Sequence, residues 1–451
     1  MFAFGFVLLI SIAWLGILIL LSDEYLVKTL IFGGVVVVGL FLRPNLLLGA
    51  LVISLIGASS FIWADVFRDV RFVLLGVFLI RALIELTAKK TSFSHLPKPF
   101  LIPLVMFVIY SFISTFYSVD PSLTFQRSLT WVVMIFALGV YLWTYMTSQE
   151  KLESMITIII NVVMLVVIVS LIAWSLGVSE VVHRHGFQGL IINPNGLGGL
   201  LALTTLPLFW KLQKTGNPLY AIVFLGFVVT LILAQSQNSG LTVIVSFAVY
   251  FALISGHRAL MLLVPVVVAA IVVFQISNPI SGALETSGRL DAWSITVDLI
   301  GAHPFLGHGF GSTESFFPNY FLPTNIFKSD NPSNAYLEML LESGIIGLVL
   351  ILIPLMLALA KGFILVRTYP DRRLIAMITA VVVGSLVHNM FESWMMSVGS
   401  MLAIPFWFFV LLIFKCDSLN LQSQQVSQEG KPLVAGHSTT TYQPGSAGLG
   451  G

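Results

Sequence analysis

Polar residues that could do chemistry are concentrated in three short segments of a chain that is 57% hydrophobic and 9% charged. The first segment, residues 182–199, contains His183, Arg184, His185, Asn193, Pro194 and Asn195. Because a proline cannot donate a backbone hydrogen bond, we expect an irregular helix at the two asparagines. The cationic run could bind an anion at the membrane surface; the alternative is an interfacial basic turn.

The second segment, residues 288–311, combines an arginine with an amphipathic helix. Its apolar residues at helical spacing are Leu290, Trp293, Val297 and Ile300. They predict a helix that lies along the membrane surface on its apolar face. Arg289 begins this helix, and its guanidinium could bind a phosphate through two parallel hydrogen bonds. The segment is therefore a candidate site for a phosphorylated ligand.

A histidine-proline step and alternating glycines end the second segment. His303 and Pro304 are followed by Gly307, His308, Gly309 and Gly311. Glycines let backbone amides approach a ligand closely, but they also serve simply to make turns. Both interpretations remain open at this point.

The third segment, residues 333–347, places acids where the chain re-enters the membrane. Glu338 and Glu342 are four residues apart on one helix face, with Asn334 on the same side. Acids at the mouth of a membrane helix are costly without a partner. We expect them either to pair with a loop arginine such as Arg289 or to include a proton acceptor. Further on, His388 and Glu392 share the same spacing and are expected to form a buried pair.

The remaining sequence consists mostly of apolar runs long enough to hold these segments in a membrane. Runs of about 17–25 residues cross the hydrocarbon core as helices, and the shorter alternating segments of a barrel are absent. We predict an all-α polytopic membrane protein with 12–14 transmembrane helices. The expected helices span 3–22, 25–42, 45–63, 70–87, 99–118, 128–148, 154–177, 189–210, 217–235, 240–255, 258–276, 335–360, 374–393 and 399–415.

The distribution of basic residues predicts the orientation of these helices, because cytoplasmic loops are enriched in Lys and Arg. With cytoplasmic termini, the outward-facing segments hold seven of the 22 basic residues: Lys28, Arg68, Arg71, Arg127, Arg184, Arg289 and Lys328. Arg81 lies inside a helix, and the other fourteen lie in inward-facing segments. This places a large loop, residues 277–334, outside the membrane.

Composition also indicates where the domains begin and end and which ligands are excluded. We divide the chain into N-terminal helices (1–181), a core that includes the loop (182–415), and a disordered cytoplasmic tail rich in Ser, Gln, Thr and Gly (416–451). The single cysteine, Cys416, rules out an intrachain disulfide, and the histidines are too scattered for a metal site. We expect no cofactor, no metal and no nucleic-acid partner.

At these polar segments the chain resembles the O-antigen ligase and polymerase superfamily. The shared motifs are R-x-G-x-x-G at 184–189, N-P-N at 193–195, G-R-x-x-x-W at 288–293, H-P-x-x-G-x-G at 303–309 and S-N-A-Y-L-E…E-S-G-I-I-G at 333–347. Their order and the long outer loop match as well, so the resemblance covers most of residues 182–347.

The resemblance implies a membrane glycosyltransferase similar to the C-type fold, with one periplasmic loop, that uses a polyprenyl-pyrophosphate-linked oligosaccharide. The transfer would be inverting and metal-independent. Arg184 and Arg289 would hold the pyrophosphate, and Glu338 or Asp330 could take the proton of the acceptor hydroxyl. His185, Asn195, His303, His308 and Asn334 are the expected substrate-binding residues.

One position at which the sequence departs from the family motif bears on the choice between ligase and polymerase. Ligases carry His, then Asn, Ser or Gln, nine residues, and Gly-x-x-Gly; here Ser333 stands at the histidine position before Asn334. Serine alone is not basic enough to act as the base. The stretches QSQNSG (235–240) and VHNMFESW (387–394) look closer to exopolysaccharide polymerases of the succinoglycan type.

The resulting hypothesis is a polymerase of lipid-linked oligosaccharide repeat units for exopolysaccharide or O-antigen. It would act at the outer face of the bacterial inner membrane, among membrane lipids, with a flippase and a chain-length regulator as pathway partners. The alternatives are a ligase that moves the glycan onto lipid A core or another acceptor, a transporter of small molecules such as inorganic carbon, and a structural subunit. The mid-helix positions are nearly all apolar, which disfavours transport.

Overall fold

The computed structural model describes residues 24–62, 64–88, 96–183, 186–255, 288–320 and 330–429. Within these residues the chain is helical except for connecting loops, one bridge between Ser60 and Ile191, and one short antiparallel pair of strands. These strands are β1 (Val182–His183) and β2 (Gly186–Phe187). Arg184 and His185 lie between them, outside the described residues.

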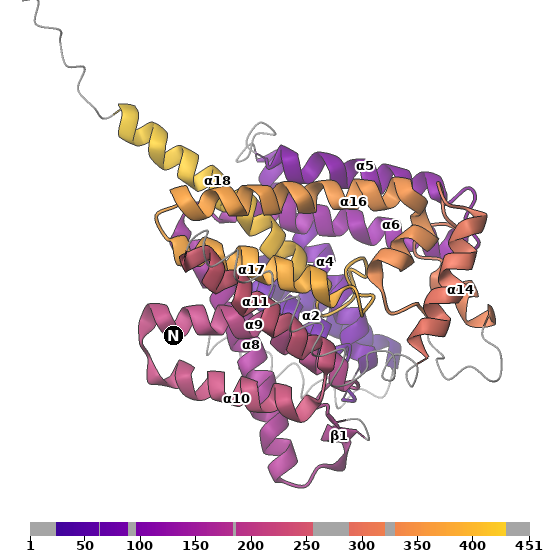
Figure 1. Ribbon diagram of the computed structural model, residues 1–451, viewed down its shortest axis with the longest axis horizontal. Coiled ribbons are helices and arrows are strands. Elements are labelled where there is room, and N and C mark those ends of the chain that lie inside the picture. The colour runs from indigo at the N-terminus through magenta and orange to yellow at the C-terminus, as the bar shows by residue number, and fades with distance from the viewer. Residues whose placement is uncertain are drawn as a thin grey trace, which may run out of the picture.

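The long helices form a layered bundle, seen in Figure 1. They are α2 (Glu24–Phe41), α3 (Pro44–Gly57), α4 (Ala64–Thr87), α5 (Lys98–Ser114), α6 (Pro121–Ile135), α8 (Gln149–Ser175), α9 (Pro194–Thr215), α10 (Pro218–Ala234), α11 (Gln237–Ser255), α14 (Arg289–Ala302), α16 (Ala335–Thr368), α17 (Arg372–His388) and α18 (Ala403–Glu429). The short elements are η2 (Phe136–Leu142), a π-helix, with α7 (Trp143–Tyr145), η3 (Ser179–Val181), α15 (Thr313–Phe316) and η4 (Phe317–Tyr320).

The expected architecture, an all-helical polytopic membrane protein, is confirmed. Five described helical runs are long and apolar enough to cross a membrane: Pro121–Tyr145, Gln149–Ser175, Gln237–Ser255, Ala335–Thr368 and Ala403–Gln422. Four shorter apolar helices accompany them: Leu30–Phe41, Pro44–Gly57, Lys98–Ser114 and Pro218–Ala234. Of the fourteen helices expected from sequence, those at 3–22 and 258–276 lie outside the described residues, and each of the others overlaps a described helix. The last helix continues past the expected boundary at 416 to Glu429.

Local sequence explains where several helices begin. Proline occupies the first turn of α3, α6, α9 and α10, where its missing N–H would have no helical partner. The residues before three of these prolines are Asp120, Asn193 and Asn217, and each side chain accepts a hydrogen bond from the first-turn backbone. These capping residues place the helix starts a few residues earlier or later than the hydropathy alone predicts.

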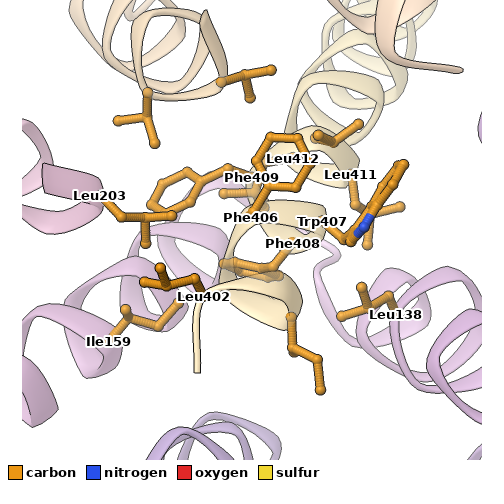
Figure 2. Close-up of a cluster of buried hydrophobic side chains, with 14 of the residues drawn as sticks. Leu138, Ile159, Leu203, Leu402, Phe406, Trp407, Phe408, Phe409, Leu411 and Leu412 are labelled. Atoms are coloured by element: carbon orange, nitrogen blue, oxygen red, sulfur yellow. The ribbon is translucent and has the colours of Figure 1, made fainter. Parts of the chain in front are cut away.

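The core is built around the first half of α18, whose residues from Ala403 to Phe414 are buried and apolar on every face (Figure 2). Phe406, Trp407, Phe408 and Phe409 are consecutive, and all four are completely buried. Their neighbours in Figure 2 include Leu138 of η2, Ile159 of α8 and Leu203 of α9. A helix that is hydrophobic all round packs inside a bundle rather than at its surface.

Contacts near the two ends of the bundle join segments that are expected on the same side of the membrane. At one end, Lys214 pairs with Glu153 and lies 3.6 Å from Asp371, and Lys361 pairs with Asp417. At the other end, Arg71 Nη1 donates to the Gly399 carbonyl at 2.5 Å. The first group belongs to the loops expected inside the cell, and the second to those expected outside.

A break in α16 determines how the polar loop is attached. Gly344 has φ 59° and ψ −167°, so α16 is kinked there. The N–H of Ile345 donates to the Pro304 carbonyl at 3.0 Å, and Tyr110 Oη lies 3.0 Å from the Leu306 carbonyl oxygen and 2.9 Å from that of Ser343. The segment that follows α14 is therefore inserted against the kink.

Candidate functional site

Arg289 lies at the start of α14 and forms an ion pair with Glu392. Its Nη2 is 3.3 Å from Glu392 Oε1, and Asn238 Nδ2 of α11 donates to the same oxygen at 3.5 Å. The two charged side chains are 18% and 22% exposed, so solvent reaches both. Gly288 precedes Arg289 with φ 68°, a left-handed conformation that glycine adopts without strain. The predicted phosphate-binding arginine is thus held by a carboxylate at an accessible position.

Glu392 belongs to the loop between α17 and α18, which also contacts the start of α16. The Ala335 N–H lies 2.9 Å from the Asn389 carbonyl and 3.2 Å from the Glu392 carbonyl. Burial raises the pKa of the Glu392 carboxyl, whereas the charge of Arg289 and the hydrogen bond from Asn238 lower it. Helices α11 and α14 therefore meet at the carboxylate of Glu392, and the start of α16 contacts its backbone carbonyl.

The sequence-based pairing of His388 with Glu392 is wrong. Helix α17 ends at His388, so the spacing of four residues does not place Glu392 on the same helical face. Instead, His388 Nδ1 accepts a hydrogen bond from Trp394 Nε1 at 2.9 Å, and its Nε2 lies 3.3 Å from Ser239 Oγ. Because Nδ1 is the acceptor, the neutral ring carries its proton on Nε2 and donates it to Ser239.

The expected partner of Glu338 and Glu342 also differs. Both side chains are buried, and the cation whose charge acts on them is Arg127 of α6 rather than Arg289. Arg127 Nη2 forms an ion pair with Glu314 at 2.5 Å. From sequence, Arg127 was assigned only to an outward-facing segment. Its closeness to Glu338 and Glu342 could not be predicted, because it lies more than 200 residues before them in the chain.

The alternating glycines pack against protein rather than presenting amides to a ligand. The N–H of Gly309 donates to the Glu342 carbonyl at 2.9 Å, and the N–H of Gly307 donates to the His303 carbonyl at the same distance. Added Cβ atoms would collide with the Glu342 backbone at Gly307, with Ser118 at Gly309 and with Arg127 at Gly311. Close packing and turn formation therefore explain these glycines.

His303 and His308 form a separate aromatic cluster near the α16 kink. Their ring centroids are 4.8 Å apart at 90°, and His308 stacks on Phe316 at 5.1 Å. His308 Nδ1 lies 3.0 Å from the Leu341 carbonyl, so Nδ1 carries the proton. Burial lowers the pKa of His308. These histidines lie at the end of α14 opposite Arg289, roughly 20 Å away at 1.5 Å per residue.

The other predicted site residues take different positions. Asn334 caps α16, where its Oδ1 accepts from the N–H groups of Tyr336 and Leu337 at 3.0 and 3.1 Å. Asp330 is exposed in the loop, and Ser333 has φ 50°. Asn195 lies in the first turn of α9, one turn before Gly198 and Gly199, which pack on Ser239 and His388.

Sequence reasoning missed the role of Asn238 and the true partner of Glu392. A signal was present, since Asn238 belongs to the polar run at 235–240 between two apolar helices. The structure brings that run together with the 387–394 stretch and with Arg289, although these three segments are far apart in sequence.

Residues 221–352 match the family model described as O-antigen ligase. The matched segment includes Asn238, Arg289 and Glu338, whereas Glu392 lies beyond its end. No curated protein sequence matches the chain. The match confirms the resemblance for the motifs at 288–293, 303–309 and 333–347, which lie inside it, whereas the motifs at 184–189 and 193–195 precede it.

Proposed function

We propose, from the O-antigen ligase match at 221–352, that this protein polymerises polyprenyl-pyrophosphate-linked oligosaccharide repeat units. The reaction takes place at the outer face of the bacterial inner membrane, and both termini are cytoplasmic. The excess of basic residues in the segments expected inside supports this orientation. Contacts near the two ends of the bundle join segments that are expected on the same side.

The observation that carries the proposal is the position of Arg289. It is charged, partly exposed and placed at the start of α14, outside the membrane-spanning helices. A guanidinium there can hold the pyrophosphate of the donor and stabilise the charge that develops when the lipid leaves. Arg184 supplies a second cation for the same group in this proposal.

The polymerase form of the proposal draws support from two stretches that resemble exopolysaccharide polymerases. Asn238 of the 235–240 run and Glu392 of the 387–394 stretch share one hydrogen bond beside Arg289. Ser239 and His388, from the same two stretches, form a second contact at 3.3 Å. Ser333 also replaces the histidine that ligases of this family carry.

The transfer is proposed to be inverting and to need no metal. An acceptor sugar hydroxyl attacks the anomeric carbon while the bond to the pyrophosphate oxygen breaks, and a protein side chain takes the hydroxyl proton. Ligation to lipid A core or another acceptor is the second candidate, because the matching family model is described by that activity.

The experiment uses purified protein in lipid discs and lipid-linked oligosaccharide extracted from the source organism. Products are resolved by gel electrophoresis. We expect a regularly spaced ladder without any added acceptor. A single transferred product that forms only with lipopolysaccharide core would establish the ligase instead, and no transfer under either condition would refute the proposed function.

A further inference from the structure

Only one of the two carboxylate oxygens of Glu392 has hydrogen-bond partners among the described residues. Both of its contacts, from Arg289 and from Asn238, converge on Oε1. Among the described residues, Oε2 has no hydrogen-bond donor. With 22% of the side chain exposed, a hydroxyl group could reach this second oxygen.

The geometry of the ion pair between Arg289 and Glu392 would allow another anion to replace the carboxylate. Arg289 touches Glu392 through one nitrogen at 3.3 Å, longer than the usual 2.7–2.9 Å of a charge-assisted hydrogen bond. A pyrophosphate carries more negative charge than a carboxylate and accepts two parallel hydrogen bonds from a guanidinium. A donor pyrophosphate would therefore compete effectively with Glu392 for Arg289.

The surroundings of Glu392 favour protonation once Arg289 is engaged elsewhere. Burial raises the pKa of this carboxyl, and Arg289 is the main opposing group. Among the described residues, the other side chain that shifts this pKa is Asn238, through its hydrogen bond. Asn238 is neutral. Binding of the donor would thus make Glu392 a stronger base.

From this geometry we infer that Glu392 is the proton acceptor of the transfer, released from Arg289 when the donor pyrophosphate binds. The inference rests on the proposed glycosyl transfer. The acceptor oxygen forms a bond to the anomeric carbon, and its proton moves to Glu392 Oε2. The bond from the anomeric carbon to the phosphate oxygen breaks, and its electron pair leaves with the polyprenyl pyrophosphate held by Arg289.

The other acids of the region are less well placed for this role. Glu342 is 2% exposed and its Oε1 is occupied by Thr313, while Glu338 is 9% exposed beside it. The cation whose charge acts on both is Arg127, which also pairs with Glu314. Glu392 is therefore the acid that adjoins Arg289 directly.

The test compares Glu392→Gln, Glu392→Asp and Arg289→Ala in lipid discs, with Asp298→Asn as the matched control. Asp298 is an exposed acid on α14 and lies about two and a half turns from Arg289. Two quantities are measured: kcat with the lipid-linked oligosaccharide, and the Kd of sugar-free polyprenyl pyrophosphate.

We expect Glu392→Gln to lower kcat by about 100-fold or more, the usual range for loss of a general base. Its Kd for polyprenyl pyrophosphate should be unchanged or tighter, because no carboxylate competes for Arg289. Arg289→Ala should weaken that Kd by about 10-fold or more. Glu392→Asp should retain more activity than Glu392→Gln, and Asp298→Asn should resemble the wild type.

Two results would overturn the inference while leaving the proposed function intact. In one, Glu392→Gln keeps more than about a tenth of the wild-type kcat. In the other, it loses pyrophosphate binding as severely as Arg289→Ala, which would make Glu392 a positioning residue for Arg289. If the wild type itself transfers no glycan, the proposed function fails and the inference fails with it.

Discussion

Glu342 and Thr313 connect the kinked helix α16 to the loop that follows α14. Glu342 Oε1 accepts a hydrogen bond from Thr313 Oγ1 at 2.8 Å and another from the Thr313 N–H at 3.3 Å. Residue Glu342 is 2% exposed, and the charge of Arg127 acts on its carboxylate. This contact attaches the glycine-containing loop to a membrane helix.

Glu342→Ala should destabilise the protein by about 1–3 kcal/mol, because it leaves the N–H and the hydroxyl of Thr313 without their buried acceptor. It also removes a negative charge that acts on Arg127. Thermal unfolding in detergent and the amount of folded protein measure the loss. Glu314→Ala is the control, since its side chain is 50% exposed and should cost about 1 kcal/mol or less. Equal losses for the two variants would show that Glu342 is not the anchor.

Gly309→Ala should be strongly destabilising. Its φ of 108° is unfavourable for a residue with a side chain, and an added Cβ would overlap Ser118. We expect a cost of about 1–3 kcal/mol or more. The control is Gly301→Ala on α14, where nothing lies within 4 Å of an added Cβ and helix stability should rise by roughly 0.5–1 kcal/mol. The two melting temperatures should move in opposite directions.

The stability of the loop should depend on pH through His308. Burial lowers the pKa of this side chain; its hydrogen bond to the Leu341 carbonyl opposes the shift, and nearby His303 adds to it. The unfolded chain therefore binds more protons here, so stability present above the ordinary histidine pKa of about 6.5 is lost as the pH falls.

His308→Asn tests this dependence because the amide can still donate to Leu341. Melting temperatures are compared at about pH 7.5 and about pH 5.5. The wild type should lose more stability on acidification than the variant. An identical loss in both proteins would assign the pH dependence to other groups.

Arg289→Ala should abolish glycan transfer while the protein remains in the membrane. Loss of a charged donor to a phosphate costs about 1.5–3 kcal/mol for each hydrogen bond, or roughly 10–150-fold in rate for each. Product formation by membranes that contain equal amounts of protein measures the effect. The control is Arg68→Ala, whose side chain is 54% exposed and pairs with Asp65 within α4. Normal glycan from Arg289→Ala would refute the placement of the pyrophosphate site.

The orientation in the membrane can be tested with single cysteines in a Cys416→Ser background. Asp298→Cys lies on exposed α14, and Thr215→Cys lies at the opposite end of the bundle, at the end of α9. An impermeant maleimide should label the first in intact spheroplasts and the second only after permeabilisation. The reverse pattern would invert the proposed topology.

The membrane helices could be predicted from sequence because the bilayer imposes a simple rule on the chain. A segment that crosses hydrocarbon must satisfy its own backbone hydrogen bonds, and this requires about 20 apolar residues in a helix. The motif at 288–293 likewise identified Arg289 as a candidate, since an arginine beside a flexible glycine suits a phosphate.

Contacts between distant segments could not be predicted in the same way. Within a helix, residues four apart share a face, and this rule suggested the pairing of His388 with Glu392. The rule failed because α17 ends at His388, which leaves Glu392 in a loop. Glu392 then meets Arg289, 103 residues away in the chain.

By itself, the sequence determined the helical membrane architecture and the polar loop segments, and it predicted Arg289 as a candidate site residue. Only the tertiary structure decided which acid adjoins that arginine, and it assigned the glycines to packing. Hydropathy and helical periodicity act over a few turns of one segment. The choice of partner for a charged side chain depends instead on how α11, α14, α16 and the 389–394 loop meet in space.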